Sequence, residues 1–248
     1  MMSQDGESVS REYVLVTGAS RGLGRAITER LIADGMHVIN FDKEAPAEIA
    51  TDERFYQVDV SDEEALRTTL ASVTAKHAIT RLVNNAGIVR PANIEHASID
   101  DLHAVMNVNI AAAIICVQAL LPAMKAAHFG RIVNISSRAA LGKKERIVYA
   151  TTKAGLLGLT RTLALELAAD GITVNAIGPG PIATELFQSA NPPGAPATQR
   201  ILDSVPLGRI GQPEEVAHLV ASLLDQRAGF TTGQVVYVCG GMTVGLSQ

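Results

Sequence analysis

The chain has 248 residues, 47% of them hydrophobic and 19% charged, a composition that suits one globular domain with a sizeable core. Its formal net charge of −4, its 4% of aromatic residues and its lack of tryptophan argue against a nucleic-acid-binding surface. Residues 1–12 lack the apolar core of a signal peptide, and no apolar run approaches the ~18 residues that cross a membrane, so we expect a cytoplasmic protein without a membrane partner.

Short β-branched runs alternate with longer helical patterns, which is typical of βαβ units around a parallel sheet. After a flexible segment over residues 1–12, we expect one domain over 13–248. Its predicted strands are Tyr13–Thr17, His37–Phe41, Phe55–Val58, Arg81–Asn84, Arg131–Ile135, Ile172–Ile177 and Gln234–Val238, and its predicted helices are about 22–34, 62–77, 99–127 and Val148–Ala169. The pattern predicts an α/β, Rossmann-type, doubly wound fold with seven parallel strands and helices on both faces.

Residues 178–205 are dense in Pro, Gly, Ala and Ser, with prolines at positions 192, 193 and 196. This composition predicts a loop, and long loops of this kind often cover active sites. We therefore expect a substrate loop over about 185–205, with Leu186 as a candidate substrate contact.

A glycine-rich turn, Thr17-Gly-Ala-Ser-Arg-Gly-Leu-Gly24, joins the first predicted strand to the first helix. Glycines let the backbone turn tightly and approach phosphate oxygens, while the helix N-terminus offers free N–H groups and the positive end of its dipole. The turn therefore predicts a dinucleotide pyrophosphate site. Its candidate cofactor contacts are Gly18, Ser20, Arg21, Gly22, Leu23 and Gly24.

Asp42 lies 18 residues after Gly24, at the end of the second predicted strand. A carboxylate at this place accepts hydrogen bonds from the adenosine ribose and repels a 2′-phosphate, which favours NAD(H). Arg21 or Lys43 could instead pair with that phosphate, so NADP(H) stays open.

Tyr149 and Lys153 are four residues apart on a predicted helix and so share one face. A phenol has a pKa of about 10, and a neighbouring ammonium and an oxidised nicotinamide would bring it toward the working range of a general base. Ser137 follows the fifth predicted strand, where α/β folds place their ligands, and its hydroxyl can hydrogen-bond a substrate oxygen. These residues predict acid/base chemistry on an alcohol or carbonyl.

Six segments in a fixed order carry a resemblance to a known family. They are the turn 17–24, Asn84-Asn85-Ala86-Gly87, Asn109, Ser136-Ser137, Tyr149-x-x-x-Lys153 and Pro179-Gly180-x-Ile182-x-Thr184. From Tyr13 to about Val244 the sequence resembles the single-domain branch of the short-chain dehydrogenase/reductase family. The resemblance implies an enzyme that moves a hydride between NAD(P)(H) and a secondary alcohol or ketone.

The resemblance also implies a role for each matching residue. Tyr149 would be the acid/base, while Lys153 would lower the tyrosine's pKa and bind the nicotinamide ribose. Ser137 would orient the substrate oxygen, and Asn109 would hold a water that relays protons between Lys153 and solvent. The other implied cofactor contacts are Asp59 and Val60 near the adenine, Asn85, Ala86 and Gly87 near the ribose, Pro179 and Gly180, and Ile182 and Thr184 at the nicotinamide carboxamide.

Two serines compete for one role. The family's usual spacing to the tyrosine selects Ser136, whereas its usual spacing from Asn109 selects Ser137. The strand pattern before the serines also selects Ser137, which we predict, with a one-residue deletion before Tyr149.

A run of charge lies between Ser137 and Tyr149, where relatives usually have small or apolar residues: Arg138 and Lys143-Lys144-Glu145-Arg146. One interpretation is a solvated loop or a subunit contact. The other is recognition of an anionic substrate, with Arg138 among the candidate substrate contacts.

Several functions stay open. A 3-oxoacyl-[acyl-carrier-protein] reductase shares the whole pattern, but most such enzymes use NADPH and carry basic residues near 126–128 and 169–171, where this chain has Ala-Ala-His and Ala-Asp-Gly. An NAD-linked alcohol or dihydrodiol dehydrogenase therefore fits better, and a regulator without catalysis is disfavoured by the presence of Tyr149 and Lys153. The resemblance further implies a homotetramer, and the distant Cys116 and Cys239 predict no metal site.

Overall fold

The computed structural model describes residues 12–192 and 194–244, and it has the predicted α/β architecture. Seven parallel strands form one sheet in the order β3-β2-β1-β4-β5-β6-β7. The strands are β1 (Tyr13–Thr17), β2 (His37–Asp42), β3 (Glu53–Gln57), β4 (Ile79–Asn84), β5 (Gly130–Ile135), β6 (Ile172–Pro179) and β7 (Val235–Val238). The order reverses between β1 and β4, which is where doubly wound sheets bind their ligands.

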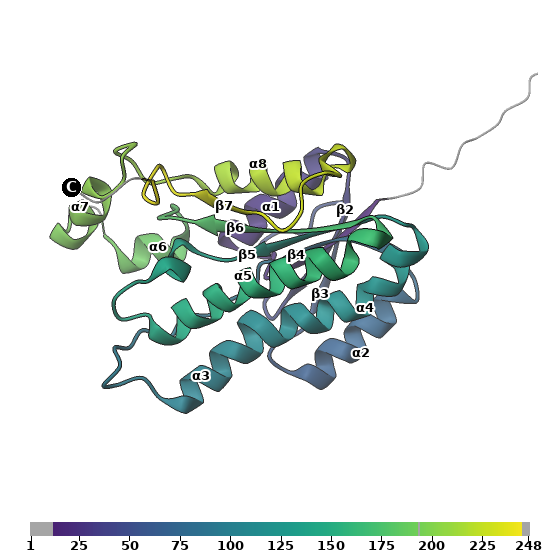
Figure 1. The fold of residues 1–248 in the computed structure, drawn as a ribbon, viewed down its shortest axis with the longest axis horizontal. Coiled ribbons are helices and arrows are strands. Elements are labelled where there is room, and N and C mark those ends of the chain that lie inside the picture. The colour runs from purple at the N-terminus through teal and green to yellow at the C-terminus, as the bar shows by residue number, and fades with distance from the viewer. Residues whose placement is uncertain (1–11, 193, 245–248) are drawn as a thin grey trace, which may run out of the picture.

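Helices cover both faces of the sheet (Figure 1). One layer holds α1 (Gly22–Ala33) and α8 (Pro213–Leu224), which pack on each other. The other holds α2 (Glu63–Thr74), α3 (Ile99–Met106), α4 (Ala112–Ala126) and α5 (Ile147–Leu167). Two short helices, α6 (Glu185–Ala190) and α7 (Pro196–Asp203), follow β6 at one end of the molecule (Figure 1).

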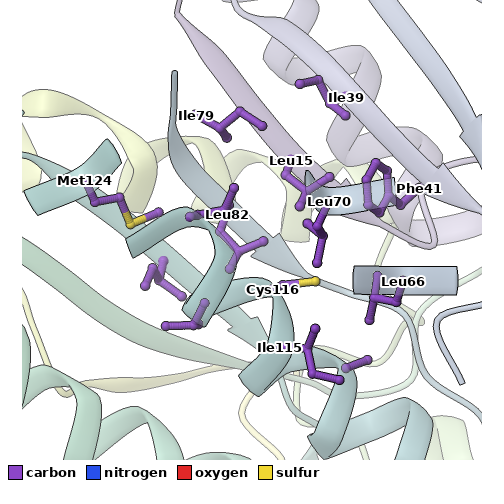
Figure 2. Close-up of a cluster of buried hydrophobic side chains, with 14 of the residues drawn as sticks. Leu15, Ile39, Phe41, Leu66, Leu70, Ile79, Leu82, Ile115, Cys116 and Met124 are labelled. Carbon is purple, nitrogen blue, oxygen red and sulfur yellow. The ribbon is translucent and has the colours of Figure 1, made fainter. Parts of the chain in front are cut away.

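A buried apolar cluster lies on each face of the sheet. Figure 2 shows the cluster beneath α2 and α4, where Leu15 and Leu82 of the central strands meet Leu66, Ile115 and other apolar side chains. The second cluster joins the opposite face to α1 and α8. Because the central strands are buried on both faces, the site at their carboxyl ends rests on a rigid support.

Half of the segment predicted as a loop over 178–205 is helical. Thr184 caps the N-terminus of α6 through its side-chain oxygen, and Pro196 is the first residue of α7. Both residue types are common at helix starts, so the composition that suggested a loop also suits two short helices. The predicted segment 1–12 lies outside the described residues except for Glu12, whose carboxylate pairs with Arg81.

The helical segment before β5 matches the predicted bounds of about 99–127 closely, but it is more apolar than we expected. Residues Ile99–Ala126 form one helix that is long and apolar enough, by length and composition, to cross a membrane, so our statement that no such run exists was wrong. In this fold the helix packs against β4, β5, α2 and α5. Its turn Asn107–Ala111 is π-helical, so Asn109 widens the helix rather than ending it.

Candidate active site

The turn between β1 and α1 is held in a tight conformation. Gly18 and Gly22 have φ angles of 65° and 53°, in the left-handed region that favours glycine. A Cβ on Gly24 would overlap the carbonyl oxygen of Gly18 and the side chain of Asn85. The turn thus requires the glycines that the motif supplies, and α1 starts where a pyrophosphate could approach its N–H groups.

Asn85 acts as a clamp on this turn. Its side-chain amide donates to the carbonyls of Thr17 at 3.0 Å and Gly18 at 2.8 Å. The Thr17 hydroxyl in turn accepts from the backbone N–H groups of Asn85 and Ala86. The Asn85 side chain therefore shapes the phosphate turn, a role that the motif alone did not indicate.

Asp42 lies beside the phosphate turn at the end of β2. One of its carboxylate oxygens accepts from the backbone N–H of Ser20 at 3.0 Å. Arg21, a candidate partner for a 2′-phosphate, is exposed and forms an ion pair with Glu44 at 3.0 Å. A carboxylate thus stands at the predicted ribose position while one of the two competing cations is already paired.

A buried polar network behind the turn was not predicted from the sequence. Asn40 donates through its amide nitrogen to the Ser20 hydroxyl at 3.1 Å and to the Glu53 carboxylate at 2.7 Å. The side chain of Glu53 is fully buried, and Arg25 donates to both of its oxygens at 3.0 and 2.9 Å. The network ties β2, β3 and α1 to the phosphate turn.

Lys153 is buried on α5 and reaches the end of β5. Its Nζ donates to the carbonyl of Ile135 at 2.7 Å and lies 5.7 Å from the centre of the Tyr149 ring. Burial lowers the pKa of Lys153 to about 8. A Cβ on Gly87 would lie 3.2 Å from this Nζ and 3.4 Å from Oδ1 of Asn109, so the glycine leaves room for both polar groups.

Asn109 is buried and both ends of its side-chain amide are hydrogen-bonded. Its Oδ1 accepts from the N–H of Ile88 at 2.9 Å, and its Nδ2 donates to the carbonyl of Ile88 and to the hydroxyl of Thr152. The side chain therefore ties the segment after β4 to α5. Thr152 was not singled out in the sequence, although it follows Tyr149 by three residues.

The two serines occupy different environments. The hydroxyl of Ser136 is buried and donates to the backbone carbonyl of Lys153 at 2.7 Å. Ser137 is half-buried; its hydroxyl accepts from the backbone N–H of Ala139 at 3.1 Å and lowers the pKa of Tyr149. This geometry supports Ser137 as the serine that meets a substrate oxygen.

We predict that Ser137→Ala lowers kcat by at least about 100-fold, because removing one preorganised hydrogen-bond donor has effects of that size. Ser136→Ala, the matched control, should keep most of its turnover, since that hydroxyl only contacts the backbone. Steady-state kinetics of both variants distinguish the two serines. A larger loss for Ser136→Ala would show that the alignment is displaced by one residue.

Tyr149 lies on the first turn of α5, and its pKa is shifted by three effects. Burial raises the pKa, while the hydrogen bond with Ser137 and the positive charge of Arg146 lower it, and the net direction is upward. The positive charge of Arg146 therefore acts on the phenol here, while the effect of Lys153 on the pKa of Tyr149 stays a prediction. The phenol is protonated at neutral pH and ready to donate.

The remaining predicted residues fall at the same edge of the sheet with varied surroundings. Thr184 lies against the phosphate turn, because a Cβ on Gly22 would be 3.7 Å from its side chain. Asp59 is exposed and accepts from the Ser61 N–H and hydroxyl, which lowers its pKa. Val60 and Ile182 are buried. Pro179 is the last residue of β6, and Gly180 follows it. The side chain of Leu186 lies outside the described part of the structure.

Together these residues form a site for a dinucleotide and a proton-transfer pair at one sheet edge. A glycine-rich turn at a helix N-terminus, a carboxylate at the end of β2, and a serine and a tyrosine near a buried lysine are the groups that nicotinamide-dependent alcohol or ketone chemistry needs. Among residues 12–192 and 194–244, no group of three or more His, Cys, Asp or Glu side chains could hold a metal ion.

Comparisons with known proteins agree with this chemistry. The family model described as enoyl-(acyl carrier protein) reductase matches residues 18–243. An acetoacetyl-CoA reductase of Shinella zoogloeoides is 41% identical and covers 92% of this chain and 96% of that protein. A 3-oxoacyl-[acyl-carrier-protein] reductase of Synechocystis is 36% identical over 96% of this chain and 99% of its own length.

The fold has close structural relatives as well. The structure titled "ElxO with NADP Bound" superposes with a TM-score of 0.87 at 30% identity, covering 94% of this chain and 98% of that one. The chain therefore belongs to the short-chain dehydrogenase/reductase family and is an NAD(P)-dependent oxidoreductase acting on keto or hydroxyl groups.

Proposed function

We propose that this enzyme interconverts a 3-oxoacyl thioester and its 3-hydroxy form with NAD(H), in the cytoplasm. The observation that carries the proposal is the placement of Tyr149 with Lys153 Nζ 5.7 Å from its ring and Ser137 acting on its pKa, in a chain whose relatives are named for acetoacetyl and 3-oxoacyl thioesters. In both an acetoacetyl and a 3-oxoacyl thioester, the ketone occupies the same position relative to the thioester carbonyl. The site offers one proton donor for such a ketone oxygen.

In the reductive direction, NADH held by the phosphate turn and Asp42 would supply the hydride that the carbonyl carbon accepts. Ser137 donates a hydrogen bond to the carbonyl oxygen, and Tyr149, protonated because burial raises its pKa, gives that oxygen its proton. The hydroxyl of Ser137 and the charge of Arg146 then stabilise the phenolate. In the oxidative direction the same phenolate accepts the proton.

We assign supporting roles to Lys153 and Asn109. Lys153 holds the nicotinamide ribose and returns a proton to Tyr149, a role suited to an ammonium whose pKa burial has lowered to about 8. Asn109 lies in a π-helical turn, a feature frequent at functional sites, and places a water between Lys153 and solvent.

A free thioester fits better than a carrier-bound one. The positions before β5 and β6 where carrier-protein reductases have basic residues are occupied by His128 and Asp170. Asp170 forms an ion pair with Lys125 at 3.0 Å, which neutralises that nearby cation. An NADPH-dependent 3-oxoacyl-[acyl-carrier-protein] reductase is the alternative, supported by the Synechocystis relative and by the NADP of the ElxO structure.

The Asp42 carboxylate supports NAD(H), so we predict that the wild type has a higher kcat/KM with NADH than with NADPH. Asp42→Ala should lower that ratio at least about tenfold, since a hydrogen bond to a charged group contributes about 1.5 to 3 kcal/mol. The measurement is initial-rate kinetics with acetoacetyl-CoA and each coenzyme. Asp52→Ala removes a carboxylate outside the predicted coenzyme site and is the control.

Two outcomes of this experiment would contradict separate parts of the proposal. If Asp42→Ala left the ratio of kcat/KM with NADH to kcat/KM with NADPH unchanged, the proposed preference for NAD(H) would be contradicted. No turnover of acetoacetyl-CoA with either coenzyme would contradict the proposal that the substrate is a 3-oxoacyl thioester.

We also propose a homotetramer. The helices 99–126 and 147–167 carry apolar side chains that the monomer leaves in water, including Leu165, which is 84% exposed, and Ile114. A monomer in light scattering would contradict this assembly.

A further inference from the structure

The segment between Ser137 and Tyr149 concentrates positive charge in a chain whose net charge is −4. It carries four cations, Arg138, Lys143, Lys144 and Arg146, against the single carboxylate of Glu145. In the described part of the structure, none of these four cations forms an ion pair with a carboxylate. The segment therefore presents charge that its own fold does not neutralise.

The backbone of this segment is fixed. Gly142 and Glu145 have φ angles of 107° and 57°, and a positive φ is unfavourable for a glutamate. The conformation is held by a hydrogen bond from the N–H of Ala92 to the carbonyl of Glu145 at 3.1 Å. The Arg146 guanidinium donates to the same carbonyl at 2.8 Å. The cations thus project from a tethered turn.

A cavity of about 540 Å³ lies between this turn, the loop after β4 and the first turn of α5. Its size is within the range of small-molecule sites. Lys143 and Lys144 line it together with Glu145, and Ile94 and Ile147 supply an apolar wall. Ala150 and Thr151, which follow Tyr149 on α5, line it as well.

The cations act on one another and on the catalytic tyrosine. Lys143 is exposed, but partial desolvation lowers its pKa, and the charges of Arg146 and Arg138 lower that pKa further. Arg146 also lowers the pKa of Tyr149. Arg146 therefore acts on both Lys143 and the phenol of Tyr149, and an anion bound in the cavity would relieve the repulsion among the cations.

We propose that this cavity binds an oxyanion, carboxylate or phosphate, that is covalently part of the substrate, with Lys143 and Lys144 as its charged contacts. The apolar wall of Ile94 and Ile147 suits a carbon chain attached to this anion. This inference rests on the proposed thioester chemistry and names the feature that selects among thioesters.

The test compares three substrates in the wild type and in Lys143→Gln/Lys144→Gln. Acetoacetyl-CoA carries phosphates, the N-acetylcysteamine thioester of a 3-oxo dicarboxylic acid carries a carboxylate, and acetoacetyl-N-acetylcysteamine carries neither. We expect KM to rise at least about tenfold for one of the anionic substrates with kcat unchanged, because charge-assisted hydrogen bonds to the anion are lost. The substrate whose KM rises identifies the anion.

Arg67→Gln/Lys76→Gln removes two exposed cations at α2 and just after it and is the matched control for net charge. An equal rise in KM for the neutral thioester, or a rise no larger than in the control, would overturn the proposal. If the wild type turns over none of the three thioesters, the proposed function fails, and titration calorimetry with pyrophosphate and glutarate tests the cavity by itself. Binding weakened about tenfold in the double variant supports the anion site, and no binding to the wild type overturns it.

Discussion

Tyr149→Phe is expected to lower kcat by at least about 100-fold while leaving coenzyme binding nearly unchanged, because general acid–base catalysis contributes about 10² to 10⁴ in rate. The substitution removes only the phenol hydroxyl, whose pKa Ser137 and Arg146 lower. The ring that Lys153 faces at 5.7 Å is retained. Steady-state kinetics give kcat, and titration calorimetry with NAD⁺ gives the dissociation constant.

A second phenylalanine variant controls for the loss of a phenol elsewhere. Tyr56 lies on β3 and its ring packs edge-on against Phe41, away from the Ser137–Tyr149 pair. Tyr56→Phe should keep kcat within about twofold, since its hydroxyl takes no part in proton transfer. Near wild-type turnover in Tyr149→Phe would contradict the assignment of the acid/base.

Arg25→Ala should destabilise the fold by about 3 kcal/mol or more, because it leaves the buried carboxylate of Glu53 without its cation. Arg25 is the only cation bonded to that carboxylate among the described residues, although Asn40 and the N–H of Ala50 still donate to it. Equilibrium denaturation in urea at matched protein concentration measures the free energy of unfolding.

Arg67→Ala is the matched control for this prediction. Arg67 also pairs with a glutamate, Glu63, at 2.8 Å, but both side chains are exposed. Surface pairs contribute about 1 kcal/mol or less, so the control should lose correspondingly little stability. If both variants lost the same free energy of unfolding, the burial of Glu53 would not make its ion pair more important for stability than a surface pair.

Much of the sheet could be predicted because central parallel strands are buried on both faces. β1 contains the apolar run Val14-Leu15-Val16, which is fully buried, and its predicted limits match the structure. The edge strand β3 has the polar sequence ERFYQ, and its predicted limits were displaced toward Val58. An edge strand needs fewer apolar residues, so its sequence signal is weaker.

Helix signals were harder to interpret near proline. α8, which we did not predict, has Pro213 at its first position and a capping box between Gln212 and Glu215, so its signals were present. α6 and α7 were hidden by the small residues around them. Proline and threonine mark both loops and helix starts, and only the packing decides between the two.

The candidate site likewise has features that the sequence predicts and features that it does not. Spacing placed Tyr149 and Lys153 on one helix face, and the glycine motif placed the phosphate turn, because both depend on local geometry. The clamp by Asn85, the pairing of Arg21 with Glu44 and the action of Arg146 on Tyr149 join segments through tertiary contacts or a loop conformation. Sequence spacing carries no information on such contacts.

The central claim is that a hydride passes directly from the nicotinamide ring to a ketone whose oxygen Tyr149 protonates. The most direct measurement is the reduction of acetoacetyl-CoA with NADH carrying deuterium on the transferring carbon, with the product analysed by NMR. We predict one deuterium on the carbon that bears the new hydroxyl group, and its near-complete loss in Tyr149→Phe over the same time. A reduced product without deuterium on that carbon would contradict direct hydride transfer.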